Sequence, residues 1–313
     1  MKNLRFKKLI IFIIFLLILI KIYLDNLDER EMWVNKAPMP TSRHSLAVVT
    51  LSDKIYAIGG YNKYLGTTDI IEIYDPKTDT WSKGKEMPTA RHSIGAIALN
   101  GKLYVIGGGS HTGQTNIVEI YDPKTDIWSR GKEMPTARET FAITTLNNKI
   151  YAIGGYNQNL GFSNIVEIYD PETDTWSKGK EMPTARGRVV GVTVDDEIYV
   201  MGGYNRTILN IIEIYDPETN TWSRGKEMPT TRRNFGVTTL NNKIYVVGGF
   251  DTNIVEIYDP KTGMWEKGPS LNYPRYELGV TTLNNKIYAI GGINPIIVEH
   301  YYIIQNTVEE YKV

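Results

Sequence analysis

The residues whose type and spacing suggest chemistry are an arginine that recurs along the chain and the residue that follows it. Each of these arginines lies ten residues after a tryptophan, and the next residue differs in almost every copy. A constant cation beside a changing position predicts a structural contact next to a recognition surface. The arginines are Arg43, Arg91, Arg138, Arg186, Arg232 and Arg275, and the following residues are His44, His92, Glu139, Gly187, Arg233 and Tyr276.

These residues match no common catalytic motif. The chain has no cysteine, which excludes disulfides, thiolate metal ligands and thiol nucleophiles. It contains no glycine-rich phosphate loop ending in Lys-Ser or Lys-Thr, no His-Glu-x-x-His and no Gly-x-Ser-x-Gly. His44 and His92 share a register, but two histidines without further ligands do not define a metal site. We therefore assign no catalytic residue, no metal and no cofactor from the sequence.

The arginines belong to a unit that is written six times. Each unit contains four short runs rich in β-branched and aromatic residues, in the first copy "SLAVVTL", "KIYAIGG", "DIIEIYD" and "TWSKG". Turn sequences such as "LNNK" and "DPKTDT" separate these runs. Four strands in a repeat of this length predict a propeller blade rather than a helical solenoid. The Gly-Gly pairs begin at Gly59, Gly107, Gly154, Gly202, Gly248 and Gly291, with spacings of 48, 47, 48, 46 and 43 residues.

The segments "KIYAIGG", "VEIYDP" and "MPTAR", together with the spaced tryptophan, resemble the kelch repeat over about residues 32–302. This resemblance implies an all-β, six-bladed kelch-type β-propeller in which the first strand of each blade lines the central channel. Trp33 precedes the first complete unit, so we expect the N-terminal strand to complete the sixth blade and close the ring. The third strand of that blade is expected near 296–302, with "NTVEEY" at 306–311 as the alternative.

The N-terminal segment differs from the repeats. Four cations in "MKNLRFKK" precede twelve apolar residues, 9–20, and no small residues follow as a cleavage site would require. We expect a signal-anchor transmembrane helix at 1–24, a short linker at 25–31, the propeller at 32–303 and a C-terminal tail at 304–313. The basic flank should remain cytoplasmic, which places the propeller on the extracytoplasmic side of a membrane. Secretion after cleavage of the segment is the alternative.

The alternating direction of the strands assigns two faces to the ring. The "LNNK" and "DPKTDT" turns fall on one face and are nearly identical in the copies, as expected of a scaffold. The loops between the second and third strands, and those that join the blades, fall on the other face, which we name the variable face. We expect its binding residues to be His44, Tyr61, Asn62, His92, His111, Glu139, Tyr156, Asn157, Arg188, Tyr204, Arg206, Arg233, Phe250, Asp251 and Tyr276.

The six repeated arginines are expected to be structural. A glutamate recurs in the third strand of each unit, and a charge near a core requires a hydrogen-bonded partner. The Gly-Gly pairs are expected to let a Trp or Tyr ring lie on bare backbone, so that buried tryptophans stabilise the contacts between blades. The kelch resemblance implies a second role for loop arginines, the recognition of acidic peptides. The glutamates expected to pair with the six arginines within the fold are Glu72, Glu119, Glu167, Glu213, Glu256 and Glu299.

These features favour a non-enzymatic module that binds a protein or a glycan and is displayed on the outer side of a membrane. Lysine plus arginine balance aspartate plus glutamate at 35 each, so a nucleic-acid partner is not expected. The resemblance also leaves open an exported sugar mutarotase of the sialic-acid epimerase type. In that alternative Glu139 and His92 would act as general acid and base, and Arg233 would hold the carboxylate of the sugar.

Overall fold

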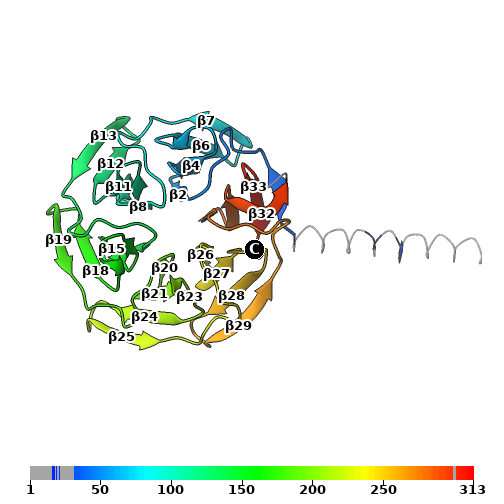
Figure 1. Cartoon of the computed structure of the whole chain (residues 1–313). Helices are drawn as coiled ribbons and strands as arrows, with labels where there is room; N and C mark the ends of the chain where they lie inside the picture. Colours follow the sequence, from blue (N-terminus) through cyan, green and yellow to red (C-terminus); the bar gives the residue numbers. More distant parts are fainter. Residues whose placement is uncertain (1–15, 18, 20, 22–31, 299–300) are drawn as a thin grey trace, which may run out of the picture.

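The computed structural model describes residues 16, 17, 19, 21, 32–298 and 301–313, and it contains six four-stranded antiparallel sheets arranged in a ring (Figure 1). The six-bladed propeller predicted from the repeats is therefore confirmed. The predicted anchor at 1–24 lies mostly, and the linker at 25–31 wholly, outside the described residues. In the part of the chain that is described, no helix has the length and apolar character needed to cross a membrane.

Each of the first five blades is formed by one continuous stretch of chain. In blade one the strands are β2 (Ala47–Leu51), β3 (Lys54–Ile58), β6 (Ile71–Asp75) and β7 (Thr80–Lys83). In blade two they are β8 (Gly95–Leu99), β9 (Lys102–Ile106), β12 (Val118–Asp122) and β13 (Ile127–Gly131). In blade three they are β14 (Ala142–Leu146), β15 (Lys149–Ile153), β18 (Val166–Asp170) and β19 (Thr175–Lys178). In blade four they are β20 (Val190–Val194), β21 (Glu197–Met201), β24 (Ile212–Asp216) and β25 (Thr221–Arg224). In blade five they are β26 (Gly236–Leu240), β27 (Lys243–Val247), β28 (Val255–Asp259) and β29 (Met264–Gly268).

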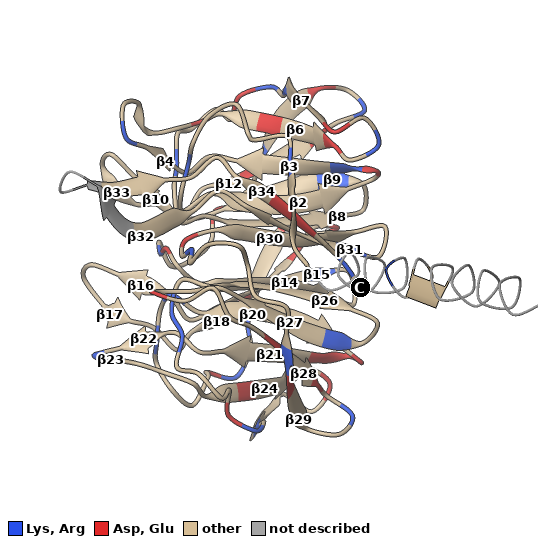
Figure 2. Ribbon diagram, turned by 90° about the vertical axis from the view of Figure 1, so that its right-hand side faces the viewer, with Lys and Arg blue, Asp and Glu red and all other residues tan. Residues whose placement is uncertain are grey.

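Short hairpins between the second and third strands project from one face of the ring, on the left in Figure 2. This is the face that we named variable. The hairpins are β4 (Tyr61–Asn62) with β5 (Gly66–Thr67), β10 (Gly109–Ser110) with β11 (Gly113–Gln114), β16 (Tyr156–Asn157) with β17 (Gly161–Phe162), β22 (Tyr204–Asn205) with β23 (Thr207–Ile208), and β32 (Ile293–Val298) with β33 (Tyr301–Ile304).

The sixth blade joins the two ends of the propeller. Its strands are β30 (Gly279–Leu283), β31 (Lys286–Ile290), β34 (Val308–Lys312) and β1 (Val34–Lys36), so the N-terminal strand closes the ring as predicted. The predicted boundary at 303 is wrong, because 308–312 is the third strand of this blade rather than part of a tail. Residues 296–298 and 301–302 lie instead in the paired strands β32 and β33, and the alternative at 306–311 was the better prediction.

Backbone carbonyls of the next blade, rather than Trp or Tyr rings, lie against the Gly-Gly pairs. Gly107 has a φ of 60°, and a Cβ at this position would lie 2.8 Å from the carbonyl oxygen of Arg138 in the next blade. The N–H of Gly108 donates to the same carbonyl at 3.0 Å. Only glycine combines this φ with so close an approach. The expectation that a Trp or Tyr ring lies on these glycines is therefore wrong.

The tryptophans contact the preceding blade from the outer side of the ring. Trp128 packs against Tyr121 with ring centroids 5.1 Å apart, and its Nε1 donates to the carbonyl of Lys85 at 3.2 Å. All six tryptophans are described, and only Trp33 is buried, with 3% of its surface exposed. Inter-blade stabilisation from six buried tryptophans was thus overestimated by the sequence interpretation.

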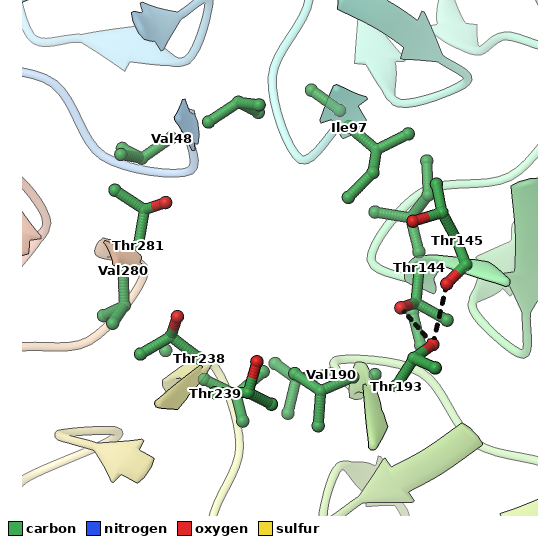
Figure 3. A pocket seen from close by; sticks show the side chains of 18 of the residues that line it. Val48, Ile97, Thr144, Thr145, Val190, Thr193, Thr238, Thr239, Val280 and Thr281 are labelled. Atoms are coloured by element: carbon green, nitrogen blue, oxygen red, sulfur yellow. Dashed lines mark hydrogen bonds between the residues drawn. The ribbon is translucent and has the colours of Figure 1, made fainter. Parts of the chain in front are cut away.

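The innermost strands surround a cavity of about 550 Å³ lined mainly by valine and threonine (Figure 3). Threonines on neighbouring blades hydrogen-bond along the wall of this channel, for example Thr144 with Thr193 and Thr50 with Thr281, both at 2.9 Å between hydroxyl oxygens. These bonds satisfy hydroxyl groups that β-branched packing brings inward. The channel opens on the variable face, where the candidate site lies.

Candidate binding site at the mouth of the channel

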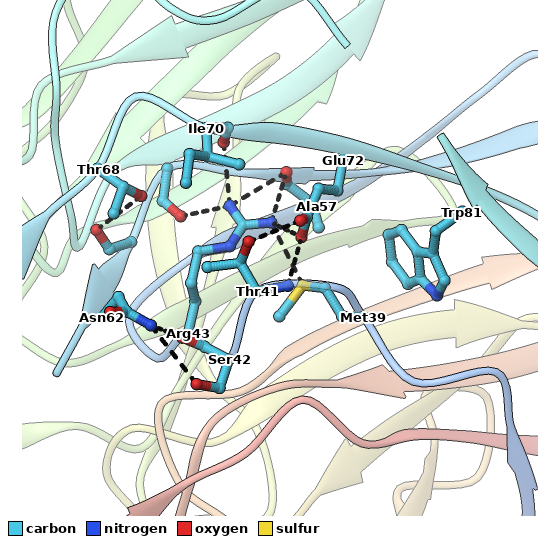
Figure 4. A network of polar contacts seen from close by, with 12 residues as sticks. Met39, Thr41, Ser42, Arg43, Ala57, Asn62, Thr68, Ile70, Glu72 and Trp81 are labelled. Atoms are coloured by element: carbon cyan, nitrogen blue, oxygen red, sulfur yellow. Dashed lines mark hydrogen bonds and ion pairs between the residues drawn. The ribbon is translucent and has the colours of Figure 1, made fainter. Parts of the chain in front are cut away.

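The repeated arginines are buried and hold the loops that carry the site, and Figure 4 shows the contacts of the first of them, Arg43. Arg43 pairs with Glu72 at 2.8 Å between Nη2 and Oε2, and its Nη1 donates to the carbonyl of Gly59 at 2.7 Å. Thr41 donates to the other oxygen of Glu72 at 2.8 Å. Burial lowers the pKa of the Arg43 guanidinium, and the neighbouring carboxylate partly offsets this effect. The equivalent pairs are Arg91–Glu119, Arg138–Glu167, Arg186–Glu213, Arg232–Glu256 and Arg275–Glu309.

Five of these ion pairs are those expected from the repeat, and the sixth is a correction. Arg275 binds Glu309 at 2.9 Å, whereas the sequence interpretation chose Glu299, which lies outside the described residues. The error follows from the misplaced third strand of blade six. Because the arginine side chains are buried and paired with glutamates, they are unavailable to a ligand.

The backbone of each repeated arginine links its own blade to the preceding one. The carbonyl of Arg91 accepts the N–H of Gly60 at 2.9 Å, while its guanidinium donates to Gly107 within blade two. The same pair of contacts recurs around the ring. The residues that follow each arginine are therefore held at the entrance of the channel by a rigid, repeated frame.

Two residues after each arginine, the chain adopts a left-handed conformation in every blade. These positions form a ring, which we name the mouth ring, with φ between 51° and 56°. Such conformations are uncommon for residues other than glycine and asparagine and each costs of the order of 1 kcal/mol or more. The mouth ring consists of Ser45, Ser93, Thr140, Arg188, Asn234 and Glu277.

Backbone hydrogen bonds between neighbouring blades hold the mouth ring. The N–H of Ser93 donates to Ser45 at 2.8 Å, and equivalent bonds join Thr140 to Ser93, Arg188 to Thr140, Ser45 to Glu277 and Glu277 to Asn234. Within residues 32–298 and 301–313, no such bond joins the N–H of Asn234 to the carbonyl of Arg188. The ring is therefore open between blades four and five.

A pocket of about 340 Å³ lies on the mouth ring and receives side chains from all six blades. Five predicted residues line it, namely His44, Tyr61, His92, Glu139 and Arg188. The sequence interpretation missed the other members of the mouth ring, although their fixed position two residues after each arginine was a usable signal. These missed residues are Ser45, Ser93, Thr140, Asn234 and Glu277.

Glu277 joins blades five, six and one. Its Oε2 accepts from His44 Nδ1 at 2.7 Å and from the Ser45 hydroxyl at 2.5 Å, and its Oε1 accepts from Asn234 Nδ2 at 2.5 Å. Burial raises the pKa of Glu277, but the hydrogen bonds from His44 and Ser45 and the charge of Arg188 together hold it below its usual value. Because an ionised carboxylate only accepts, His44 carries its proton on Nδ1.

His92 and Glu139 lie next to each other in the lining of the pocket, both close to Gly109. The Nδ1 of His92 lies 3.1 Å from the Ser93 hydroxyl, and Gln114 donates to Glu139 Oε1 at 3.1 Å. Burial lowers the pKa of His92, and the charge of Glu139 opposes that shift only in part. The imidazole is therefore mainly neutral at pH 7. Among the described residues, no group of three or more His, Cys, Asp or Glu side chains could hold a metal ion.

Arg233 lies in an aromatic cluster beside the pocket. Its guanidinium carbon is 5.1 Å from the Tyr204 ring and 4.5 Å from the Phe250 ring, so the cation lies within cation–π distance of both rings. Phe250 also packs against Tyr276 at 5.2 Å between ring centroids. Arg233 is not among the residues that line the pocket, so the structure does not bring it together with Glu139 and His92 as the mutarotase alternative requires.

The remaining predicted residues lie away from the pocket. The buried side chain of Asn62 donates to the carbonyl of Ser42 at 2.8 Å and accepts from the backbone of its own loop, so it shapes the loop instead of facing a ligand. Asn157 does the same in blade three. Tyr156 packs against Phe162 in the β16–β17 hairpin. Exposed positions on the loops of the variable face are occupied by His111, Arg206 and Asp251.

Comparisons with known proteins agree with this architecture. The family model described as the KLHDC2/KLHL20/DRC7 Kelch-repeats domain matches residues 23–203 and 131–292, and the Kelch motif model matches 274–313. Kelch-like protein 26 of Danio rerio is 34% identical over 56 residues, which are 18% of this chain and 9% of that relative. The family models cover most of the chain, and the six blades have the expected strand order. The chain belongs to the kelch-repeat β-propeller family.

Proposed function

We propose that this chain is a non-enzymatic protein-binding module that takes a segment of its partner into the mouth of the channel. Membership of the kelch-repeat family supports binding as the function. The location is supported by a contrast between the buried arginines, which repeat, and the mouth ring, which does not. The buried arginine is the same in all six blades, whereas the mouth ring has a different side chain in almost every blade. Such a surface is asymmetric and can distinguish one ligand orientation from another.

The observation that carries the proposal is a pair of guanidinium groups, that of Arg188 in the lining of the pocket and that of Arg233 beside it. Arg188 is exposed, and its side chain makes no hydrogen bond or ion pair within the part of the chain that the structure describes. Arg233 packs against two aromatic rings, and its buried Nε lacks a partner among the described residues. A stacked guanidinium presents its N–H groups at the edge, where a carboxylate binds in a bidentate manner. Blades four and five therefore suit an acidic group of the partner.

The test is an array of peptides probed with the full chain, followed by affinity measurements on the peptides it selects. Arg188→Gln and Arg233→Gln are each expected to weaken binding of acidic peptides about tenfold or more, because each removes a charge-assisted contact. Arg206→Gln, on the same face but outside the pocket, is the control and should bind like the parent. Equal affinities for all three variants would contradict the proposal. If the chain binds glycans on a parallel array but no peptides, the ligand is a carbohydrate and the proposal of a protein ligand is wrong.

We also propose that residues 1–24 anchor the propeller in a membrane, with the variable face directed away from it. The basic flank and the apolar run at 9–20 support the anchor. The orientation is supported by β1, which enters the ring from the opposite face and reaches the variable face at Lys36, the partner of Val308. We expect the full chain to remain in the membrane pellet after alkaline extraction, and release into the supernatant would refute the anchor.

A further inference from the structure

The part of the pocket formed by blades one to three differs from the part that contains Arg188, because it presents the carboxylate of Glu139. The residue that follows each repeated arginine pairs through its backbone with the residue directly after the Gly-Gly pair. In blade two these two residues are His92 and Gly109. A Cβ at Gly109 would lie 2.6 Å from Glu139 Oε2 and 2.7 Å from His92 Cε1. A larger side chain would therefore occupy the space into which the carboxylate extends. The other blades have Tyr61, Tyr156, Tyr204, Phe250 and Ile293 at this position.

One oxygen of this carboxylate is free to accept. Gln114 binds Oε1 of Glu139, whereas Oε2 has no hydrogen bond or ion pair with any residue that the structure describes. Glu277, the other carboxylate in the pocket, differs because three neighbouring side chains occupy both of its oxygens. A half-buried carboxylate with an unused oxygen attracts a cation, since the surrounding dielectric is lower than that of water.

An aromatic face and a neutral histidine complete this wall. Tyr61 is 38% exposed, and its ring lies nearly perpendicular to that of His92, with centroids 6.5 Å apart. A cation over the face of a tyrosine is stabilised by the ring quadrupole. The charged or titratable groups that act on His92 are Glu139, His44 and Glu277, and burial keeps its imidazole mainly neutral at pH 7. His92 therefore does not repel a bound cation at that pH.

We propose that Glu139, the ring of Tyr61 and the space left by Gly109 form a subsite for a basic side chain of the bound partner. The ammonium of lysine or the guanidinium of arginine would donate to Glu139 Oε2 and rest against the Tyr61 ring. The inference rests on the proposed function and adds a second charge to the ligand. The preferred partner segment carries a basic residue for blades one to three and an acidic residue for blades four and five.

The experiment uses the full chain and an array of N-acetylated, C-amidated peptides in which Lys, Arg, Asp, Glu and Ala replace each position of a selected binder. The parent protein should select a basic residue at one position and an acidic residue at another. Glu139→Gln should lose about tenfold of the preference for the basic residue and keep the acidic preference. Arg188→Gln should show the reverse pattern. Because the peptide termini are blocked, selection reports side chains rather than a free amino group.

Each outcome separates the two proposals. If the parent protein binds no peptide, the proposed function fails and the subsite fails with it. If acidic peptides bind but the parent has no basic preference, or if Glu139→Gln retains that preference, only the subsite is overturned. Gly109→Tyr provides a second variant that retains Glu139 but fills the space into which its carboxylate extends, and it should also lose the basic preference. His111→Ala, exposed in the same blade, is the matched control and should behave like the parent.

The pH dependence of the basic preference is a further readout of the same subsite. The pKa of His92 lies below its usual 6.5, so the imidazole gains charge only as the pH falls below that value. A charged His92 repels the basic side chain, and the preference should weaken on acidification. In His92→Gln, which cannot gain this charge, the preference should persist to lower pH. A basic preference that strengthens on acidification in the parent would contradict this arrangement.

Discussion

A chain that ends at residue 303 is expected to lose cooperative folding of the propeller. Strand β34, at 308–312, pairs with β31 and β1, so its removal leaves blade six without its third strand and β1 without a partner. It also removes Glu309, the carboxylate that compensates the buried Arg275. Breaking a buried ion pair costs about 3–5 kcal/mol, which is a large part of the roughly 5–15 kcal/mol that stabilises a typical domain.

Thermal unfolding followed by circular dichroism, together with soluble yield, measures this effect. Deletion of Val313 alone is the control, because this residue is 43% exposed and lies beyond the paired strand, and it should not change the transition. Glu309→Gln keeps the strand and should lower the transition without abolishing it. A chain ending at 303 that unfolds in the same sharp transition as the full chain would refute the role of 308–312 in blade six.

Arg91→Met is expected to destabilise the propeller by about 3–5 kcal/mol. The substitution leaves Glu119 buried, with Thr89 and the more exposed Arg130 as its remaining side-chain donors. It also removes the donor that binds the carbonyl of Gly107 at 2.9 Å. Methionine retains most of the aliphatic volume, so the loss reports mainly the charge and its hydrogen bonds.

The matched control uses the same carboxylate. Arg130 lies 3.4 Å from Glu119, but its side chain is 56% exposed, and a surface contact of this kind contributes between about 0 and 1 kcal/mol. Guanidinium chloride unfolding of the full chain should therefore separate Arg91→Met from Arg130→Met by at least about 2 kcal/mol. Similar midpoints for the two variants would show that the buried position of Arg91 has no special role.

The sixth blade illustrates where sequence reasoning was insufficient. The segments near 296–302 and at 306–311 both match the local pattern of a third strand, because each places valine and glutamate together. Local pattern cannot choose between them. The choice depends on which segment reaches both β31 and β1, and on which glutamate approaches Arg275 across the fold.

The mouth ring illustrates a second limit. Left-handed φ angles are usually inferred from glycine or asparagine, but this ring contains threonine, arginine and glutamate. Thr140 and Glu277 therefore had no local signature of their conformation. Hydrogen bonds from neighbouring blades impose it, and Glu277 acquires its partners His44 and Asn234 only because blades one and five lie on either side of it.

The amino-acid sequence alone determined the number of blades, the closing strand, five of the six buried ion pairs and the division into a repeated and a variable face. These features follow from contacts that recur within each blade, so six copies reinforce the same short-range pattern. Tertiary structure decided the third strand of blade six, the left-handed mouth ring and the pocket with its opposed charges. Those features are formed by unlike residues from different blades, and their contacts exist only once the ring is closed.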